Sequence, residues 1–570
     1  MSEIAVPQPP SDQPSNDDSN QPSANKESFF VNAQSTKWRK HFWRLPAWFA
    51  AALVLMPILV IALSWTSDQS DIWAHLIQTQ LGTLLGNTLK LCIGVGSIAI
   101  FLGVSLAWLV SVCEFPGRRW LDWGLMLPLA IPTYVVAFVA LGLFDFSGPV
   151  QTQLREWFGS DFRMPSIRSA GGVSLVLSAV LYPYVYMLSR SAFMSQGRGL
   201  VDAARMLGRT PLQAFWSVAL PMARPAIAAG AALALMETLA DFGAVAVFNY
   251  DTFTTAIYKS WFGFFNLPAA AQLASVLLLF VALALFAEQK ARGGGRLFEV
   301  PAQERERFKL KGARAYLATG YCLLIFVLAF VIPVGQLLFW VVETGLGGLD
   351  QRYIDLVLHT FALGAIAASL TVSLAIAVAF GQRQLGNISA KGFAMRAASL
   401  GYAFPGSVLA VGIMLSFAKV DSVLVAPVRA LLDMPPKQIL VGSVVALILA
   451  YCVRFFTVGL GPIQSSFERL KPSFQEAAQS LGANKWQLLW RVYLPMLSPG
   501  IFAGMLLVLV DVMKEMPATL LLRPFGWDTL AVRVYEMTSE GEWERAALPA
   551  LSLVLLSLAP VVLMIRRSRR

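Results

Sequence analysis

Long apolar runs alternate with short polar segments along almost the whole chain. Twelve runs are long enough to cross a bilayer as a helix, which takes about twenty apolar residues and satisfies its own backbone hydrogen bonds in lipid. The pattern therefore predicts an all-α polytopic membrane protein with about 12 transmembrane helices. The predicted spans are 46–64, 84–112, 122–144, 171–190, 220–247, 269–287, 316–341, 359–381, 397–418, 438–459, 495–522 and 546–565.

Composition agrees with this pattern. Of the 570 residues, 56% are hydrophobic and only 14% are charged, which leaves too little polar surface to cover a soluble core of this size. The net charge of +11 could suggest nucleic acid, but the basic residues lie between the apolar runs. We therefore expect a lipid bilayer as partner and no nucleic acid. The four cysteines have neither paired spacing nor histidine neighbours that would indicate a disulfide framework or a zinc site.

The loops define an orientation and a division of the chain. Most of the 45 Lys and Arg residues fall on one side if the N-terminus is cytoplasmic, so the positive-inside rule places both termini in the cytoplasm. A polar start poor in apolar residues predicts disorder. The expected units are a disordered cytoplasmic tail at 1–45, a first transmembrane domain at 46–287, a charged cytoplasmic linker at 288–315, a second transmembrane domain at 316–565 and a basic C-terminal tail at 566–570.

Two polar loops repeat one another at an offset of 274 residues. Each holds an acid, two alanines and a glycine, followed by a Leu-Pro pair. Six spans per half is an even number, so both halves share one orientation and both loops face the cytoplasm. The repeat indicates a protein that docks the same partner twice. The positions are Asp202, Ala203, Ala204, Gly208, Leu220 and Pro221 in the first copy and Glu476, Ala477, Ala478, Gly482, Leu494 and Pro495 in the second.

Each loop is predicted to form two short helices around a break. Gly208 and Gly482 suit the left-handed position that ends a first helix. A polar residue and a glutamine three positions later then predict a capping box at the start of a second helix. These pairs are Thr210 with Gln213 and Asn484 with Gln487.

The apolar segment after each loop carries two acids, again 274 residues apart between the halves. Charged groups in a membrane are costly and normally face a cavity or one another, so these acids are candidates for a translocation pathway. Their spacing of four predicts that each pair shares one helical face. Carboxylate oxygens suit a hard cation, although a structural role, paired to Lys514 or Arg454 or placed at the outer mouth with water, stays open. The acids are Glu237, Asp241, Asp511 and Glu515.

At the loop residues the chain resembles the membrane subunit of bacterial binding-protein-dependent ABC importers, whose cytoplasmic loop reads E-A-A-x3-G followed by I-x-L-P. The first copy departs by having Asp202 in place of Glu. The resemblance implies the type I importer fold, a place in the inner membrane, two copies of a cytoplasmic ABC ATPase on the two loops, and a periplasmic substrate-binding protein.

No Gly-x4-Gly-Lys-Ser/Thr motif occurs in the chain. Such a loop cradles nucleotide phosphates. ATP and Mg2+ would therefore be bound by the partner ATPase, and we expect this chain to bind no cofactor, to have no catalytic residues and to act as a permease rather than an enzyme.

Three segments further resemble fused ferric-iron permeases, which implies Fe3+ as substrate with transient contacts at the pathway acids. They are Met236–Gly243, Phe253–Tyr258 and Lys514–Arg523. Fused permeases for thiamine share the architecture, and related systems carry polyamines, phosphonates, sulfate or molybdate. An ion-driven secondary transporter also fits twelve spans in two parallel halves, but such a carrier has no need of ATPase-docking loops. A membrane scaffold without transport is a third possibility.

Overall fold

A computed structural model describes residues 42–568, except 293–306, 346, 386–391 and 433–437. Almost all of the predicted tail at 1–45, the middle of the predicted linker and the end of the predicted C-terminal tail lie outside these residues. Within them, eleven helices are long and apolar enough to cross a membrane. The twelfth predicted run forms helix α26 (Trp543–Ser568). The predicted all-α membrane fold is confirmed.

The long helices follow the predicted spans closely at most boundaries. In the first half they are α2 (Leu45–Leu63), α4 (Leu81–Val112), α6 (Thr133–Phe144), α8 (Ala170–Met206), α10 (Leu220–Ala240) and α13 (Leu267–Arg292). In the second half they are α14 (Ala313–Phe326) with η5 (Val327–Val331) and α15 (Ile332–Thr344), then α16 (Gln351–Leu385), α18 (Gly406–Val420), α20 (Val444–Glu468), α23 (Leu494–Lys514) and α26.

Short elements connect the long helices. In the first half they are η1 (Ser64–Thr66), α3 (Ser70–Thr79), α5 (Arg118–Gly124), η2 (Leu127–Ala130), α7 (Pro149–Phe158), α9 (Pro211–Ala214), η3 (Phe215–Ala219), α11 (Gly243–Val247), α12 (Phe253–Tyr258) and η4 (Lys259–Gly263). In the second half they are α17 (Phe393–Ser399), η6 (Leu400–Ala403), η7 (Asp421–Val425), α19 (Ala426–Leu431), α21 (Pro472–Ser480), α22 (Lys485–Gln487), η8 (Leu488–Tyr493), α24 (Pro517–Leu522) and α25 (Leu530–Ser539).

The predicted spans 122–144 and 397–418 are not single helices, which corrects the sequence prediction. The chain breaks at Pro132 in the first half and at Pro405 in the second, and α6 and α18 begin directly afterwards. Proline lacks an N–H and pushes the preceding residue out of the helical region. Ile131 and Phe404 accordingly have ψ angles of 125° and 129°.

The predicted spans 220–247 and 495–522 also break, and they do so at the acids themselves. Helix α10 ends at Ala240 and α23 ends at Lys514. Asp241 and Glu515 are extended, with ψ angles of 125° and 109°. The expectation that each acid pair shares one helical face is therefore wrong, because the second acid of each pair has left the helix.

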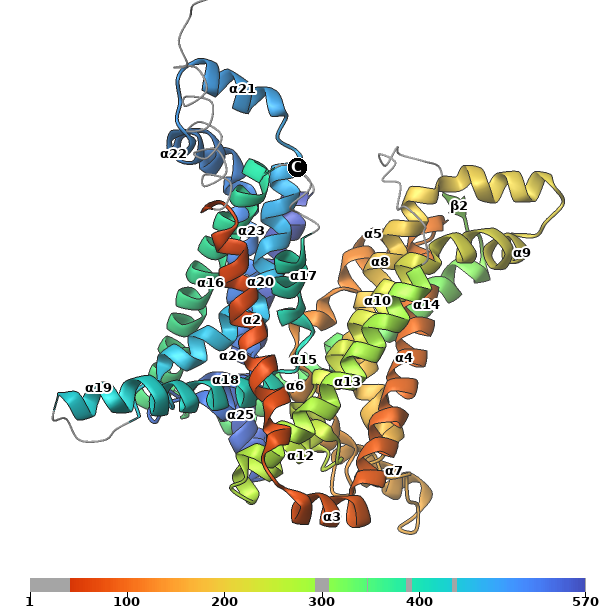
Figure 1. The fold of residues 1–570 in the computed structure, drawn as a ribbon. Helices are drawn as coiled ribbons and strands as arrows, with labels where there is room; N and C mark the ends of the chain where they lie inside the picture. The colour runs from red at the N-terminus through yellow and green to blue at the C-terminus, as the bar shows by residue number, and fades with distance from the viewer. Residues whose placement is uncertain (1–41, 293–306, 346, 386–391, 433–437, 569–570) are drawn as a thin grey trace, which may run out of the picture.

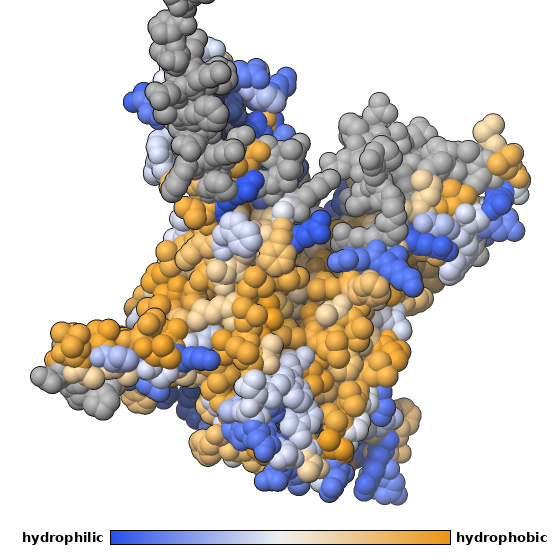
Figure 2. Space-filling view, in the orientation of Figure 1, coloured by the Kyte–Doolittle hydropathy of each residue, from blue (hydrophilic) through white to orange (hydrophobic). Residues whose placement is uncertain are grey.

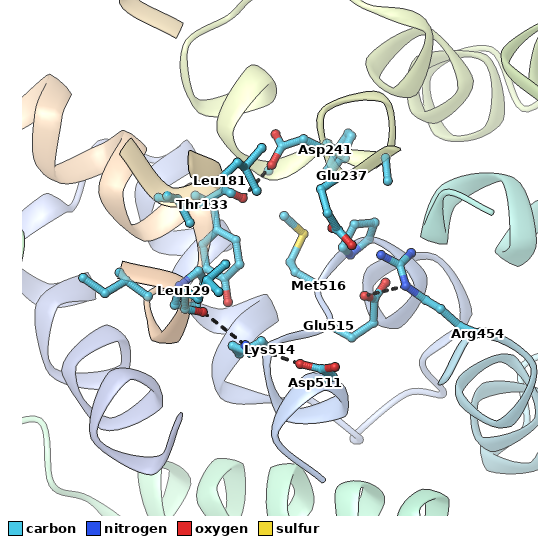
Figure 3. Close-up of a pocket in the computed structure, with 18 of the residues that line it drawn as sticks. Leu129, Thr133, Leu181, Glu237, Asp241, Arg454, Asp511, Lys514, Glu515 and Met516 are labelled. Carbon is cyan, nitrogen blue, oxygen red and sulfur yellow. Dashed lines mark hydrogen bonds and ion pairs between the residues drawn. The ribbon is translucent and has the colours of Figure 1, made fainter. Parts of the chain in front are cut away.

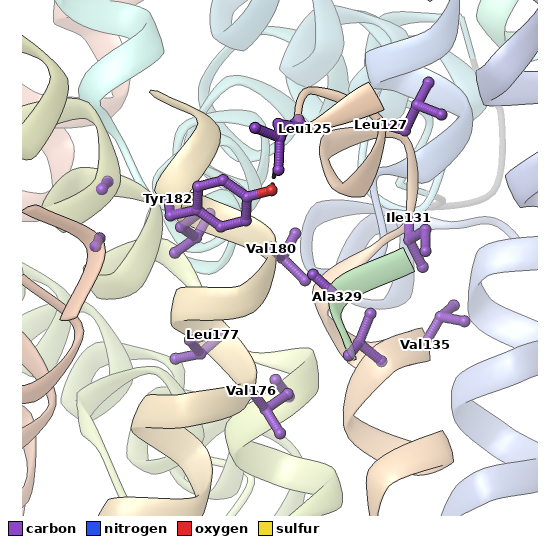
Figure 4. Packing of buried hydrophobic residues seen from close by; sticks show 14 of the residues in the cluster. Leu125, Leu127, Ile131, Val135, Val176, Leu177, Val180, Tyr182 and Ala329 are labelled. Atoms are coloured by element: carbon purple, nitrogen blue, oxygen red, sulfur yellow. Dashed lines mark hydrogen bonds between the residues drawn. The ribbon is translucent and has the colours of Figure 1, made fainter. Parts of the chain in front are cut away.

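The first helix of each half packs on the other half. Helix α2 contacts α17 and α18, while α14, η5 and α15 contact α5, η2, α6 and α8. Figure 1 shows α2, coloured red, among the green and blue helices of the second half. Figure 4 shows Ala329 of η5 packed beside Val135 and Val180 of the first half. The two halves therefore exchange helices.

Small residues permit this close packing, as is usual between membrane helices. A Cβ added at Gly412 of α18 would lie 2.7 Å from Pro57 Cβ of α2. The side of α2 that faces the second half is apolar throughout. Its buried residues are Ala50, Ala51, Val54, Pro57 and Ile61.

The end of the linker returns to the first half. Strands β1 (Cys113–Glu114) and β2 (Phe308–Lys309) pair in parallel and form the one β ladder in the described ranges. The N–H of Leu310 donates to the carbonyl of Glu114 at 3.0 Å. This ladder fixes the start of α14 beside the first half.

The surface carries an apolar band. Figure 2 shows hydrophobic residues across the middle of the molecule and hydrophilic residues gathered toward its two ends. Large apolar side chains within this band are exposed, among them Ile93 and Phe101 of α4 at 61% and 67%. An exposed apolar surface of this extent is typical of contact with lipid.

Candidate translocation cavity and cytoplasmic hairpins

The second repeated loop forms the hairpin that the sequence predicts, and we call residues 472–493 the second hairpin. Helix α21 ends before Gly482, which has a φ of +79°. The side chain of Asn484 accepts from the N–H of Gln487 at 2.8 Å, and the Asn484 N–H donates to Gln487 Oε1 at 2.9 Å. The left-handed glycine and the capping box are both confirmed.

The first loop, residues 202–219, is the first hairpin and differs in one respect. Gly208 has a φ of +82°, and Thr210 and Gln213 form the predicted capping box before α9. Helix α8, however, continues to Met206, so its backbone includes Asp202, Ala203 and Ala204 without an interruption. The side chains of these three residues lie outside the described part of the structure. The prediction of a separate first short helix is wrong for this copy.

Proline explains the difference between the hairpins. Pro472 begins α21, and Lys471 before it is extended with a ψ of 141°. The equivalent position in the first copy, 274 residues earlier, holds Arg198. An arginine keeps its N–H and lets the helix continue, whereas a proline favours an extended residue before it.

Both hairpins join the next span through a π-helix, which the sequence analysis did not predict. Segments η3 and η8 lie directly before Leu220-Pro221 and Leu494-Pro495. A proline cannot donate the ordinary helical bond, and a wider turn is one way for a helix to accommodate this loss. The repeated Leu-Pro pair is the sequence signal that could have revealed these segments.

Each hairpin presents an exposed leucine at the same position of the repeat. Leu207 is 83% exposed and Leu481 is 88% exposed. Glu476 and Ala477 are also exposed, whereas Ala478 is half-buried. Figure 1 shows the two hairpins, with α9 and α21–α22, on separate arms at the same end of the molecule. An exposed apolar group on a polar end is available for contact with a partner.

All four predicted pathway acids line one cavity of about 140 Å³ between the halves. Figure 3 shows Glu237 and Asp511, from the last turns of α10 and α23, around it together with Asp241 and Glu515 from the breaks that follow. Two cations, Arg454 of α20 and Lys514 of α23, also line this central cavity. The 274-residue offset therefore located residues that the fold brings together, and the volume leaves room for several water molecules.

The acids of the first half are held by uncharged donors. Glu237 Oε1 accepts from the Tyr402 hydroxyl at 3.1 Å, across the joint between the halves. Asp241 Oδ2 accepts from the Thr133 hydroxyl at 2.5 Å. Asp241 Oδ1 accepts from the N–H groups of Ala244 and Val245 at 2.9 and 3.2 Å, so this carboxylate caps α11.

The acids of the second half are paired with cations. Arg454 Nε lies 3.3 Å from Glu515 Oε2, and both side chains are about nine-tenths buried or more. Lys514 Nζ lies 3.4 Å from Asp511 Oδ1 and donates to the carbonyl of Leu129 at 3.5 Å. The structural alternative from the sequence, pairing to Lys514 or Arg454, thus holds for Asp511 and Glu515.

A metal ion would find no preformed cage here. Among the residues that the structure describes, no three His, Cys, Asp or Glu side chains gather in the way that a bound metal requires. The four acids instead stand apart around the cavity.

A family model agrees with the duplicated arrangement. The model of the binding-protein-dependent transport system inner membrane component matches residues 99–290 and again 371–567. The chain belongs to this family. The permease is therefore a multi-pass inner-membrane component of an ABC importer that depends on a binding protein, and it is not an enzyme.

Individual relatives extend the comparison. The permease is 28% identical to the Fe(3+)-transport system permease protein FbpB 2 of Haemophilus influenzae over 91% of this chain and 98% of that protein. It is 31% identical to the molybdenum transport system permease protein ModB of Escherichia coli over 34% of this chain and 86% of that protein. A solved bacterial alginate ABC transporter, in complex with an alginate pentasaccharide-bound periplasmic protein, covers 45% of this chain with 16% identity and a TM-score of 0.35.

Proposed function

We propose that this permease carries Fe3+ across the inner membrane, driven by two copies of a cytoplasmic ABC ATPase. A periplasmic binding protein delivers the substrate, and both termini lie in the cytoplasm. The observation that carries the proposal is the charge of the central cavity, where four carboxylates face two cations. The similarity to an Fe(3+)-transport permease along almost the whole chain supports the same substrate.

The ATPase copies dock on the two hairpins. Support comes from their common end of the molecule, their exposed Leu207 and Leu481, and the left-handed glycine that shapes each one. ATP and Mg2+ are held by the ATPase, and this chain contributes no cofactor site. Glu476 is exposed and available to cations of the partner, and Asp202 holds the equivalent position of the first copy.

Each hairpin has a direct helical connection to the cavity. Helices α10 and α23 begin at the Leu-Pro pairs, contain 21 residues each and end at Ala240 and Lys514, directly before Asp241 and Glu515. At about 1.5 Å per residue, each helix spans about 30 Å. Closure of the ATPase pair would move both hairpins, and these helices would carry that movement to the acids. The cavity would then alternate between inward-facing and outward-facing forms.

The two pairs of acids have different roles in this proposal. In the described ranges Glu237 and Asp241 have no Lys, Arg or His nitrogen within ion-pair distance, whereas Asp511 and Glu515 each have one. The first pair thus lines the cavity without a protein cation beside it, and its hard carboxylate oxygens suit Fe3+. The second pair is occupied by two cations of its own half, Arg454 and Lys514.

The docking hypothesis is tested by Gly482→Pro. Proline cannot adopt a φ of +79° and also loses the N–H bond from residue 482 to the carbonyl of Gln479. We expect normal membrane insertion, continued ATP hydrolysis and loss of most substrate uptake in reconstituted vesicles. Gly442→Pro is the matched control, because Gly442 also has a positive φ but lies away from both hairpins.

Wild-type uptake in Gly482→Pro would refute the docking role. Uptake that resists vanadate but collapses with an uncoupler would instead favour an ion-driven carrier.

The substrate hypothesis is tested by Glu237→Gln combined with Asp241→Asn. Each change removes one charge from the cavity and keeps the shape of the side chain. At an effective dielectric constant of 20, a unit charge about 4 Å away contributes about 4 kcal/mol. We therefore expect uptake of radiolabelled iron to fall by at least about tenfold while ATPase assembly is retained.

The control for this variant is Asp145→Asn, since Asp145 pairs with Arg168 outside the cavity. Unchanged iron uptake in the double variant would remove both acids from the pathway. If the wild-type permease takes up labelled thiamine faster than iron, thiamine and not iron is the substrate.

A further inference from the structure

The two ends of helix α2 are held by different parts of the permease. Trp43 precedes α2 and packs on the second hairpin, with ring centroids 6.2 Å from Trp486 and 5.1 Å from Phe380 of α16. Lys485 Nζ of α22 lies 5.3 Å from the centroid of the Trp43 ring. Trp43 also packs against the buried cluster that contains Leu488 of η8. The N-terminal end of α2 is therefore fixed to the second hairpin.

The C-terminal end of α2 is fixed to the first half through Gln272 of α13. Its Nε2 donates to the carbonyls of Ser64 and Ser67 at 3.0 and 3.2 Å, and its Oε1 accepts from Trp73 Nε1 at 2.6 Å. Gln272 is 2% exposed. Trp65 Nε1 adds a bond to the Ser275 hydroxyl of α13 at 2.8 Å. Buried polar networks that are fully bonded are rigid.

Between these ends α2 is a continuous helix of 19 residues, about 28 Å long. Its weakest point would be Pro57, which cannot donate a backbone hydrogen bond. That residue packs directly on Gly412 of α18, which supports the helix there. The helix is thus stiff along its length and anchored at both ends.

A similar contact occurs where the other exchanged helix begins. Phe308 of β2 packs against Ala214 of the first hairpin, and Ala214 is fully buried. Each hairpin therefore touches the segment that leads into an exchanged helix. The recurrence in both halves argues that the contact of Trp43 is more than incidental packing.

We propose that α2 acts as a strut that passes movement of the second hairpin to the far end of the first half. Trp43 and Gln272 are its positioning residues. This inference rests on the proposed function in one respect, namely that the ATPase moves the second hairpin. With the strut, one hairpin acts on both halves, through α23 on its own half and through α2 on the other.

The first test is amide hydrogen exchange on the purified permease without any partner. Trp43→Ala should raise exchange in residues 485–493. Gln272→Ala should raise exchange in the same residues, although Gln272 is bonded to the opposite end of α2. If exchange of the second hairpin is unchanged in Gln272→Ala, the strut is refuted, whatever the ATPase experiments show.

The second test measures uptake of labelled iron per ATP hydrolysed by the full complex in vesicles. We expect Trp43→Ala and Gln272→Ala each to lower this ratio by about threefold or more. The double variant should be no worse than either single variant, because both break the same strut. Trp43→Phe should restore most of the ratio. Trp48→Ala is the control, since it removes an equal ring from the first turn of α2, at a site that is 51% exposed and packed on Phe393.

Several outcomes would overturn the proposal. One is an equal fall in ATPase activity and uptake, which would leave the ratio unchanged. A second is a double variant whose loss in the ratio equals the two single losses multiplied together. A third is a Trp48→Ala variant that behaves like Trp43→Ala. Failure of the docking hypothesis is seen separately, as normal uptake in Gly482→Pro.

Discussion

Gly406 lies at the start of α18, directly against the buried ion pair of Arg454 and Glu515. The corresponding residue of the first half is Thr133, which follows Pro132 as Gly406 follows Pro405. Thr133 donates its hydroxyl to Asp241, whereas Gly406 leaves the space that the guanidinium and carboxylate occupy. One side chain at this position thus determines whether the neighbouring acid meets a hydroxyl or a cation.

Gly406→Ala should therefore destabilise the permease. The added methyl group would collide with the Glu515 carboxylate and with Arg454, so this buried ion pair would have to shift and would lose part of its geometry. Overpacking of this kind costs about 1–3 kcal/mol. We expect a lower midpoint of thermal unfolding for the variant in detergent.

The matched control is Gly461→Ala on α20, where an added Cβ meets nothing within 4 Å. Alanine favours a helix over glycine by about 0.5–1 kcal/mol, so this change should leave the midpoint equal or slightly higher. An equal midpoint for Gly406→Ala and wild type would contradict the steric argument.

At the scale of elements, hydropathy predicted where spans lie but not where they break. Runs such as 46–64 and 269–287 correspond closely to α2 and α13. The breaks at Pro132 and Pro405 were visible as repeated prolines, yet an apolar count does not register a missing N–H. The break at Glu515 is likewise followed by a proline, Pro517 at the start of α24. The break at Asp241 had no such signal, and its backbone carbonyl is held by the hydroxyl of Thr254.

The sequence predicted the acids of the candidate site but not the residues that bond to them. A constant offset finds equivalent residues, and the fold brings the four acids to one cavity. It does not find their partners, such as Tyr402 for Glu237, which lies 165 residues away. Lys514 and Arg454 could be named as possible partners from the sequence, because a charged side chain inside a membrane usually pairs with an opposite charge. The uninterrupted α8 was foreseeable from Arg198, where the second copy has Pro472.

At the scale of the whole molecule, the exchange of first helices makes each half part of the other. Helix α2 packs on α17 and α18, and α14 packs on the first half. The linker is therefore not the main connection between the halves. The cavity contacts of Tyr402 and Lys514 add polar bonds across the joint.

Two separate chains divided between Ala291 and Arg307 should accordingly assemble when they are produced together. We expect the untagged first half to co-purify with a tagged second half in detergent. A first half that begins at Asp68, and so lacks α2, should co-purify several times less well. Equal yields with and without α2 would show that the exchanged helix contributes little to assembly.

The exchange of α2 also sets an order of events during synthesis. About 330 residues separate its last residue, Leu63, from the first residue of α17, Phe393. At about 5–20 residues per second, the ribosome needs roughly 15–70 s to make that stretch. During this interval α2 stands in the bilayer before its binding surface exists. Its interior stripe of Ala50, Val54, Pro57 and Ile61 bears no charge. Lipid chains can thus cover the stripe until the later helices arrive and displace them.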